Sequence, residues 1–267
     1  MLRATSSDGT VLAYDRSGSG PPLILVDGAL CSRAFGPMPK LAPLLASRFT
    51  VYTYDRRGRG GSGDTPPYAI GREIEDIATL VREAGGPASL LGLSSGAALA
   101  LEAAAAGVPV ERVVAYEPPY VNDGSGTGSV DHLARLHGLV AKRDRAGAVR
   151  YFMRDMVGVP APFVLLMRMM PWVWPRMKAV AHTLPYDATV MRGFQVPAAR
   201  MASILVPVLV VYGGRTDARL ARAARAVADA VPGARVQVLA GQTHNVDPHA
   251  LTPVAAEFLG SGRSCAS

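Results

Sequence analysis

The stretch that decides the fold occupies residues 89–106 and reads SLLGLSSGAALALEAAAA. Its first five residues are an apolar run of strand length, and the alanine-rich part from Ser95 onward has the composition of a helix. Between them lies Gly92-Leu93-Ser94-Ser95-Gly96, a G-x-S-x-G sequence at the junction of strand and helix. Glycines flanking such a tight turn leave room for the neighbouring strand and helix, while the central residue takes a strained backbone conformation.

The turn predicts that the hydroxyl of Ser94 stands above a sheet. The helix N-terminus behind it offers free N–H groups to a developing negative charge. The simpler alternative is a glycine-rich helix start in which Ser94 or Ser95 acts only as an N-cap.

Outward from this stretch, apolar runs alternate with helix-length segments. Several runs are apolar on both faces, as in a parallel sheet covered by helices. The alternation predicts an α/β fold, with a mostly parallel twisted sheet and helices on both of its faces. Asp8-Gly9 predicts a hairpin turn before the first run. The predicted strands are 11–15, 23–27, 50–55, 89–93, 112–117, 206–214 and 235–241, and the predicted helices are 70–84, 95–106, 218–231 and 248–259.

The alternation stops between Tyr120 and Ile204, where no strand pattern is visible. A glycine- and serine-rich loop at 123–129 is followed by short helical stretches separated by prolines. Eight of the ten methionines and both tryptophans lie here. We interpret residues 120–204 as a helical cap inserted into a core of residues 1–119 and 205–260, with a flexible tail at 261–267.

Four cap residues are candidates to line a substrate pocket, because methionine and aromatic side chains make adaptable apolar surfaces. The alternative is that they only fill the core of the helical segment, which such side chains do as readily. The candidates are Met167, Met170, Trp172 and Trp174.

Composition narrows the class of protein. With 267 residues, 49% of them apolar, the chain can bury a sizeable core. The net charge is +7, but the basic residues are scattered and no zinc-finger or RNA-binding motif is visible, so we expect no nucleic-acid partner. No apolar run approaches the roughly 18–20 residues needed to span a bilayer, so we expect no membrane partner. Without an apolar signal segment, and with Cys31 far from Cys265, we expect a cytoplasmic protein.

A serine nucleophile needs a base, and His244 is the best candidate among five histidines. It follows the last predicted strand in Gly241-Gln242-Thr243-His244-Asn245. Loops at the carboxyl ends of strands in an open α/β sheet converge on one site, where Ser94 is also expected. His132, His137 and His182 fall in the predicted cap, and His249 falls in the last helix. His244, Asp247 and His249 are too few for a metal site, so we expect no metal.

Four motifs in order make the chain resemble the α/β-hydrolase superfamily over nearly its whole length. Leu25-Val26-Asp27-Gly28-Ala29 resembles the family's oxyanion strand and loop, and residues 55–62, DRRGRGGS, match its D-x-R-G-x-G-x-S turn. Gly92–Gly96 matches the nucleophile elbow, and Gly241–His244 matches the G-x-x-H ending. Within the superfamily the chain is most similar to small actinobacterial esterase-type members, and to the zearalenone lactonase group, which shares the S-S-G elbow.

The resemblance implies that the backbone N–H groups of Ala29 and Ser95 form an oxyanion hole. One residue departs from the family pattern, because Asp27 stands where a histidine is usual before Gly28. Since that histidine mainly organises the loop and the donors are backbone groups, the hole need not be lost.

Two carboxylates qualify as the acid that would orient His244. Asp217 follows the run 206–214, where most α/β-hydrolases place their acid, but it also suits an N-cap for the next helix. Glu117 ends the run 112–117 in the expected centre of the sheet, where a carboxylate is costly without a partner. The zearalenone lactonase group places a glutamate there, and we favour Glu117. If Arg57 or Arg59 paired with Glu117 instead, Asp217 would be restored as the acid.

The combination predicts a serine hydrolase of carboxylic esters or lactones with an apolar or aromatic part, working through an acyl-enzyme without a cofactor. The partner expected is therefore a small apolar ester or lactone. Two other readings stay open. One is thioester release, cyclisation or C–C cleavage of a natural product at the same site, and the other is a hydrolase-like ligand receptor.

Overall fold

The fold is a single mixed sheet with helices on both faces, seen here in a computed structural model that describes residues 1–121 and 131–261. The loop predicted at 123–129 and residues 262–267 of the predicted tail lie outside the described residues. Within the described chain eight strands follow the order β1-β2-β4-β3-β5-β6-β7-β8. The first two pairings, β1 with β2 and β2 with β4, are antiparallel, and the rest are parallel. This confirms the predicted fold class.

Seven strands match the predicted apolar runs closely, and one was missed. The matching strands are β2 (Val11–Ser17), β3 (Pro22–Val26), β4 (Thr50–Tyr54), β5 (Ala88–Leu93), β6 (Val110–Tyr116), β7 (Val208–Gly213) and β8 (Arg235–Leu239). The missed strand, β1 (Leu2–Thr5), lies at the sheet edge and buries only Ala4, so it has no apolar run. Its pairing of Thr5 with Val11 around Gly9, which has a φ of 84°, confirms the hairpin turn.

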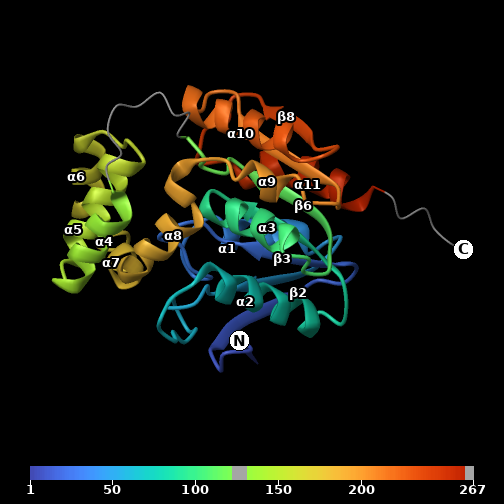
Figure 1. Cartoon of the computed structure of the whole chain (residues 1–267), viewed down its shortest axis with the longest axis horizontal. Coiled ribbons are helices and arrows are strands. Elements are labelled where there is room, and N and C mark those ends of the chain that lie inside the picture. Colours follow the sequence, from blue (N-terminus) through green and yellow to red (C-terminus); the bar gives the residue numbers. More distant parts are fainter. Residues whose placement is uncertain (122–130, 262–267) are drawn as a thin grey trace, which may run out of the picture.

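Two separate apolar layers hold the helices on the sheet. On one face pack α2 (Ile70–Glu83), α3 (Ser95–Ala105) and α10 (Ala218–Ala230), and on the other pack α1 (Met38–Leu45) and α11 (Pro248–Gly260) (Figure 1). The sequence did not reveal α1, since the prolines at positions 37, 39 and 43 hide its helical pattern. All strands from β3 onward end at the same edge of the sheet, because their pairings are parallel.

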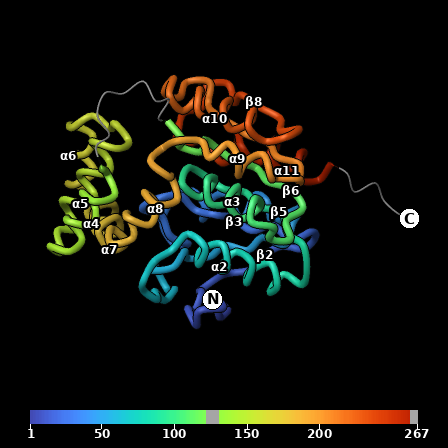
Figure 2. Tube along the Cα trace, viewed as in Figure 1, coloured from blue at the N-terminus to red at the C-terminus, as the bar shows by residue number. Residues whose placement is uncertain are grey.

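Between β6 and β7 the described residues form helices and no strand. They are α4 (His132–Ala141), α5 (Arg145–Tyr151), η1 (Phe152–Met156), α6 (Ala161–Met169), α7 (Trp174–Val180), η2 (Ala181–Thr183), α8 (Leu184–Val190), η3 (Arg192–Phe194) and α9 (Ala198–Met201). Figures 1 and 2 show α4 to α7 as a group beside the sheet, with α8 between this group and the core. The group has its own apolar core, which also packs against Leu30 and Phe35. The exact limits of a cap at 120–204 stay a prediction.

No helix in residues 1–121 and 131–261 is both long and apolar enough to cross a membrane.

Candidate active site

Ser94 sits on the sharp turn that the sequence predicted between β5 and α3. Its φ and ψ are 54° and −124°, a conformation that side-chain-bearing residues rarely adopt. The flanking glycines are required, because a Cβ on Gly92 would lie 2.4 Å from Gly96 O and a Cβ on Gly96 would lie 2.1 Å from Val26 O. The Ser94 N–H donates to Tyr116 O of β6 at 2.9 Å, which anchors the strained residue to the sheet.

Glu117 and His244 meet beside this turn. Oε2 of Glu117 lies 2.6 Å from Nδ1 of the His244 ring, and its Oε1 accepts from the Gly213 N–H at 2.8 Å. Glu117 is fully buried directly after β6, so its carboxylate is partnered on both oxygens, as the cost of burying it demands. With Nδ1 turned to the carboxylate, Nε2 is the ring nitrogen left to face other groups.

The loop that carries His244 is fixed to the neighbouring strands. The Tyr116 hydroxyl donates to Thr243 O at 2.6 Å, and a Cβ on Gly213 would lie 2.3 Å from Gln242 O. Tyr116 was not singled out from the sequence. On a strand buried on both faces, no alternation of polar residues marks the one side chain that reaches the histidine loop.

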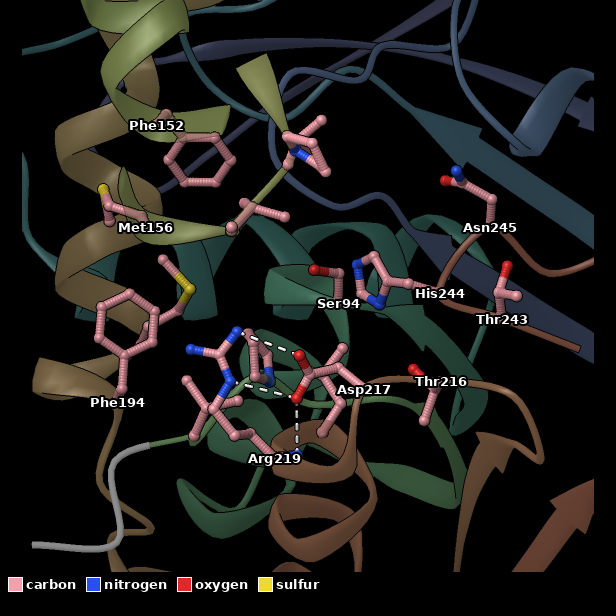
Figure 3. Close-up of a pocket in the computed structure, with 18 of the residues that line it drawn as sticks. Ser94, Phe152, Met156, Phe194, Thr216, Asp217, Arg219, Thr243, His244 and Asn245 are labelled. Carbon is pink, nitrogen blue, oxygen red and sulfur yellow. Dashed lines mark hydrogen bonds and ion pairs between the residues drawn. The ribbon is translucent and has the colours of Figure 1, made fainter. Parts of the chain in front are cut away.

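Asp217, the alternative acid, does not contact His244. It caps α10, its Oδ1 accepting from the Arg219 N–H at 2.7 Å, and its half-exposed carboxylate pairs with the Arg219 guanidinium at 3.1 Å (Figure 3). The adjacent Arg219 keeps the pKa of Asp217 below its ordinary value. Neither arginine that could have competed for Glu117 does so, because Arg57 pairs with Asp76 and Arg59 with Asp187.

A cavity of about 350 Å³ opens in front of Ser94 and His244. In Figure 3 the Ser94 hydroxyl points toward the side chains of Phe152, Met156 and Phe194, with the His244 ring on its other side. Within the described residues no hydrogen bond joins this hydroxyl to the ring, and such contacts often tighten only when substrate binds. The apolar lining is Pro119, Val121, Phe152, Met156, Val157, Val159, Pro160, Met191, Phe194 and Leu220, and the polar lining includes Arg215, Thr216, Asp217, Arg219, Thr243 and Asn245.

The four cap residues predicted to line a pocket are not at this cavity, and that prediction needs correction. Met167, Met170 and Trp172 belong to α6 and the turn after it. Met167 and Met170 are half-buried and Trp172 is 61% exposed, but none of the three lines the cavity. Trp174 is buried inside the apolar core of the group α4 to α7. The lining comes instead from η1, the loop before α6, and η3.

The loop after β3, which carries Ala29, lies against the turn at Ser94. A Cβ on Gly28 would lie 3.0 Å from Leu93 O and 3.2 Å from Cβ of Ser94, so a larger residue there would crowd this turn. Ser95 is the first residue of α3, whose opening N–H groups have no partner within the helix. Among the backbone hydrogen bonds of turns, loops and caps in the described residues, none is donated by the N–H of Ala29 or by the N–H of Ser95.

Comparison with known proteins shows the family to which the chain belongs. The family model described as "Alpha/beta hydrolase family" matches residues 18–257. The chain belongs to the alpha/beta hydrolase family. No curated protein sequence matches it.

Among solved structures, this alpha/beta hydrolase is 51% identical to an alpha/beta hydrolase from Sphaerobacter thermophilus, with a TM-score of 0.90 over 96% of this chain and 99% of that one. A hydrolase from Pseudomonas aeruginosa is 26% identical, with a TM-score of 0.75 over 97% and 98% of the two chains. An enol-lactonase from Burkholderia xenovorans is 24% identical, with a TM-score of 0.68 over 97% and 99%, and shares the fold.

The alpha/beta hydrolase carries an unusual acid beside the Ser94 turn. Asp27 is buried and neither of its carboxyl oxygens has a hydrogen-bond partner within the described chain. Burial raises the pKa of Asp27 to about 8, although the Arg59 and Arg56 charges oppose the shift. The side chain is therefore neutral at pH 7 in the folded protein, which is how an unpaired buried carboxyl avoids the cost of a charge.

Asp27→Asn should become more stable relative to the wild type as the pH rises. An unfolded aspartate ionises near pH 3.9, whereas the folded one keeps its proton to about pH 8. Between these values rising pH favours the unfolded wild type by up to about 1.4 kcal/mol per pH unit, a loss that the uncharged asparagine avoids. Thermal melts from pH 4.5 to 7.5 should show the Tm difference growing by roughly 3 °C per pH unit. Parallel Tm curves for the two proteins would show that Asp27 is ionised when folded.

Within the described residues, no group of three or more His, Cys, Asp and Glu side chains is placed to hold a metal ion.

Proposed function

We propose that this protein is a serine hydrolase that cleaves a carboxylic ester or lactone with an apolar or aromatic part, through an acyl-enzyme. One observation carries the proposal: a histidine held at 2.6 Å by a buried carboxylate lies beside a serine on a strained strand-to-helix turn, at the mouth of one cavity. A nucleophile, a base and a group that orients the base are the parts that acyl transfer requires.

The proposed chemistry follows from the orientation of the His244 ring. Ser94 Oγ attacks the substrate carbonyl while Nε2 takes its proton, and the Glu117 carboxylate stabilises the imidazolium that forms. The ring then returns the proton to the leaving alkoxide, which leaves an acyl group on Ser94. Water, deprotonated by the same nitrogen, attacks the acyl-enzyme and releases the acid.

The oxyanion of each tetrahedral intermediate is assigned to the N–H groups of Ala29 and Ser95. The close approach of Gly28 to the Ser94 side chain supports this assignment, because it places the loop that carries Ala29 beside Ser94, the residue directly before α3. A single donor of this kind contributes about 3–4 kcal/mol to the transition state.

The cavity supports a compact and largely apolar substrate. Its volume of about 350 Å³ is at the low end of small-molecule sites, and most of its lining is aliphatic or aromatic. Glu117 after β6 is the acid position that the likeness to the zearalenone lactonase group implies. Lactone cleavage is the chemistry of the enol-lactonase from Burkholderia xenovorans, which shares this fold. The free thiol of Cys31 fits the cytoplasmic location that we propose with this activity.

Covalent labelling tests the proposal directly. A fluorophosphonate should phosphonylate Ser94 in the wild type, and fragmentation of the labelled peptide should place the adduct on Ser94 and not on Ser95. His244→Ala should react far more slowly, because the serine then lacks its base. An unlabelled wild type would contradict a reactive nucleophile and favour a ligand receptor. If Ser94 is labelled, products formed in ¹⁸O-water separate hydrolysis, which incorporates the isotope, from cyclisation.

The corrected cavity lining predicts which methionine governs substrate choice. Met156→Gln should raise KM for an aromatic ester about 10-fold while changing KM for the acetate of the same alcohol by less than about 2-fold. The polar amide removes apolar contact from the larger acyl group, and burial of a methionine-sized surface is worth about 1.5–3 kcal/mol. Steady-state kinetics with both esters in one variant cancels any inactive fraction.

Met169→Gln is the matched control, because the same substitution falls on a side chain 73% exposed and away from the cavity. It should leave both KM values unchanged. An equal effect of the two variants, or an equal rise of KM for both esters in Met156→Gln, would show that Met156 acts only through packing.

A further inference from the structure

A buried cluster of charges lies directly beneath the loop that carries Ala29. Arg56 and Arg59 come from the turn after β4, and Asp187 comes from α8 in the cap; all three are almost completely buried. Asp187 Oδ1 accepts from Arg56 Nη1 and its Oδ2 accepts from Arg59 Nη2, each at 2.7 Å. Although burial opposes ionisation, the two guanidinium groups hold the pKa of Asp187 below its ordinary value, so the cluster is charged.

Arg59 binds the Gly28–Ala29 peptide, whose N–H is the first proposed oxyanion donor. Its Nη1 donates to Gly28 O at 2.6 Å. The Gly28 carbonyl and the Ala29 N–H belong to one planar trans peptide, in which the two groups point in opposite directions. Fixing the carbonyl therefore fixes the direction of the N–H, and a charged donor on the carbonyl also polarises the N–H into a stronger donor.

The same carboxylate holds the residue of the second proposed donor. Ser95 Oγ donates to Asp187 Oδ1 at 2.7 Å, and Arg56 Nη1 lies 3.3 Å from Ser95 Oγ and from Asp27 O. Asp187 thus binds Ser95 with one oxygen and, through Arg59, the Gly28–Ala29 peptide with the other. The two donors come from chain segments 66 positions apart, and a single cap residue joins them.

We propose that Asp187 and Arg59 are positioning residues that aim the Ala29 and Ser95 N–H groups at the oxyanion, so that the seated cap sets the strength of the oxyanion hole. This rests on the proposed function, since an oxyanion must form at Ser94. Arg59 Nε also donates to Thr183 Oγ1 at 3.1 Å, so Nε, Nη1 and Nη2 each have a partner, and a rotation that frees the Gly28 carbonyl would also break the bonds to Thr183 and Asp187. Both positioning residues lie behind the donors and do not line the cavity.

A second buried carboxylate supplies a matched control for the alternative that the cluster only ties the cap to the core. Glu102 of α3 is also fully buried and also accepts from two arginines, Arg192 and Arg200 of the cap, each at 2.6 Å. Among the described residues Glu102 has no hydrogen bond to the loop at 27–31 or to Ser95. Glu102→Gln therefore weakens a cap-to-core pair without touching either donor.

The test compares Asp187→Asn, Arg59→Lys and Ser95→Ala with Glu102→Gln and the wild type. For an activated ester, Asp187→Asn and Arg59→Lys should lower kcat about 100-fold with KM changed by less than about 3-fold, because misdirected donors act on the transition state. Arg59→Lys keeps the charge, yet one ammonium cannot bond Gly28 O, Thr183 and Asp187 in the same planar arrangement. Glu102→Gln should lower Tm by about as much as these two variants do, and its kcat should stay within about 2-fold of the wild type.

Affinity for an alkyl boronic acid is the readout that a merely structural role would not move. Boron bonded to Ser94 Oγ becomes tetrahedral and places an oxygen in the oxyanion hole, so its Kd should rise in each variant by the factor by which kcat falls. Ser95→Ala, which removes only a hydroxyl and keeps the N–H, should show both effects at about 10-fold even if the charge variants fold poorly.

Unchanged kcat and boronate Kd in folded Ser95→Ala and Asp187→Asn, with an active wild type, would overturn this inference and leave the proposed function standing. A wild type that neither turns over esters nor binds the boronic acid would overturn both.

Discussion

Ser94→Ala should lower kcat for an activated ester by about 10⁶-fold, the cost of removing the nucleophile from a triad that works as a unit. The variant keeps the groups proposed to bind the substrate and the oxyanion, so KM should change little. Stopped assays with a p-nitrophenyl ester measure the residual rate, and thermal melts measure folding.

The fold should survive this substitution. Within the described residues the Ser94 hydroxyl makes no hydrogen bond, and alanine carries the same Cβ into the same strained turn. Ser95→Ala is the neighbouring control, and its expected loss of about 10-fold is five orders of magnitude smaller. Comparable hydrolysis by the wild type and Ser94→Ala would remove the acyl-enzyme from the proposal.

The features predictable from the sequence are those encoded locally. The turn at Ser94 is indicated by two glycines that close contacts require, and the buried strands are indicated by apolar runs such as VLVVYGG at 208–214. Glu117 could be singled out because a carboxylate at the end of a central strand has to find a partner. The loop order of an α/β sheet then made His244 the partner expected, and the structure brings the two side chains together.

The pocket could not be predicted, because it depends on how the cap is seated. Methionines and tryptophans mark apolar surface, but whether Met156 or Met169 faces the cavity is decided by the rotation of each short helix against its neighbours. The π-helical turn Phe152–Met156 adds a further change of direction that no sequence period reveals. Asp187 was missed for a similar reason: its partners Arg56 and Arg59 are more than 120 residues away, and no local pattern links them.

Glu117→Gln is expected to lower kcat by about 10⁴-fold with little change in Tm, which would make Glu117 the acid of the proposed triad. The glutamine oxygen can still accept from the Gly213 N–H, but its amide then turns an N–H toward His244 Nδ1. Nδ1 must accept that bond, so the proton moves to Nε2, the nitrogen that has to take the proton from Ser94. Because glutamine and glutamate side chains have nearly the same size, the loss of kcat reports the change in the tautomer of His244.

Asp217→Asn is the matched amide substitution and should give the opposite pattern. Asparagine caps a helix about as well as aspartate, so the bond to the Arg219 N–H persists, and the half-exposed ion pair that disappears is worth at most about 1 kcal/mol. The expected result is a kcat within about 2-fold of the wild type and a Tm lower by no more than a few degrees. A steep loss of kcat in Asp217→Asn with a normal Glu117→Gln would move the acid to the end of β7, and this would require the β7 loop to swing Asp217 away from Arg219 and onto His244 during turnover. Glu117 is buried, both of its oxygens are bonded, and it already contacts His244 Nδ1 at 2.6 Å. Asp217 could therefore reach this nitrogen only after the contact with Glu117 had broken. Normal activity in Glu117→Gln is the one result that would indicate such an exchange during turnover.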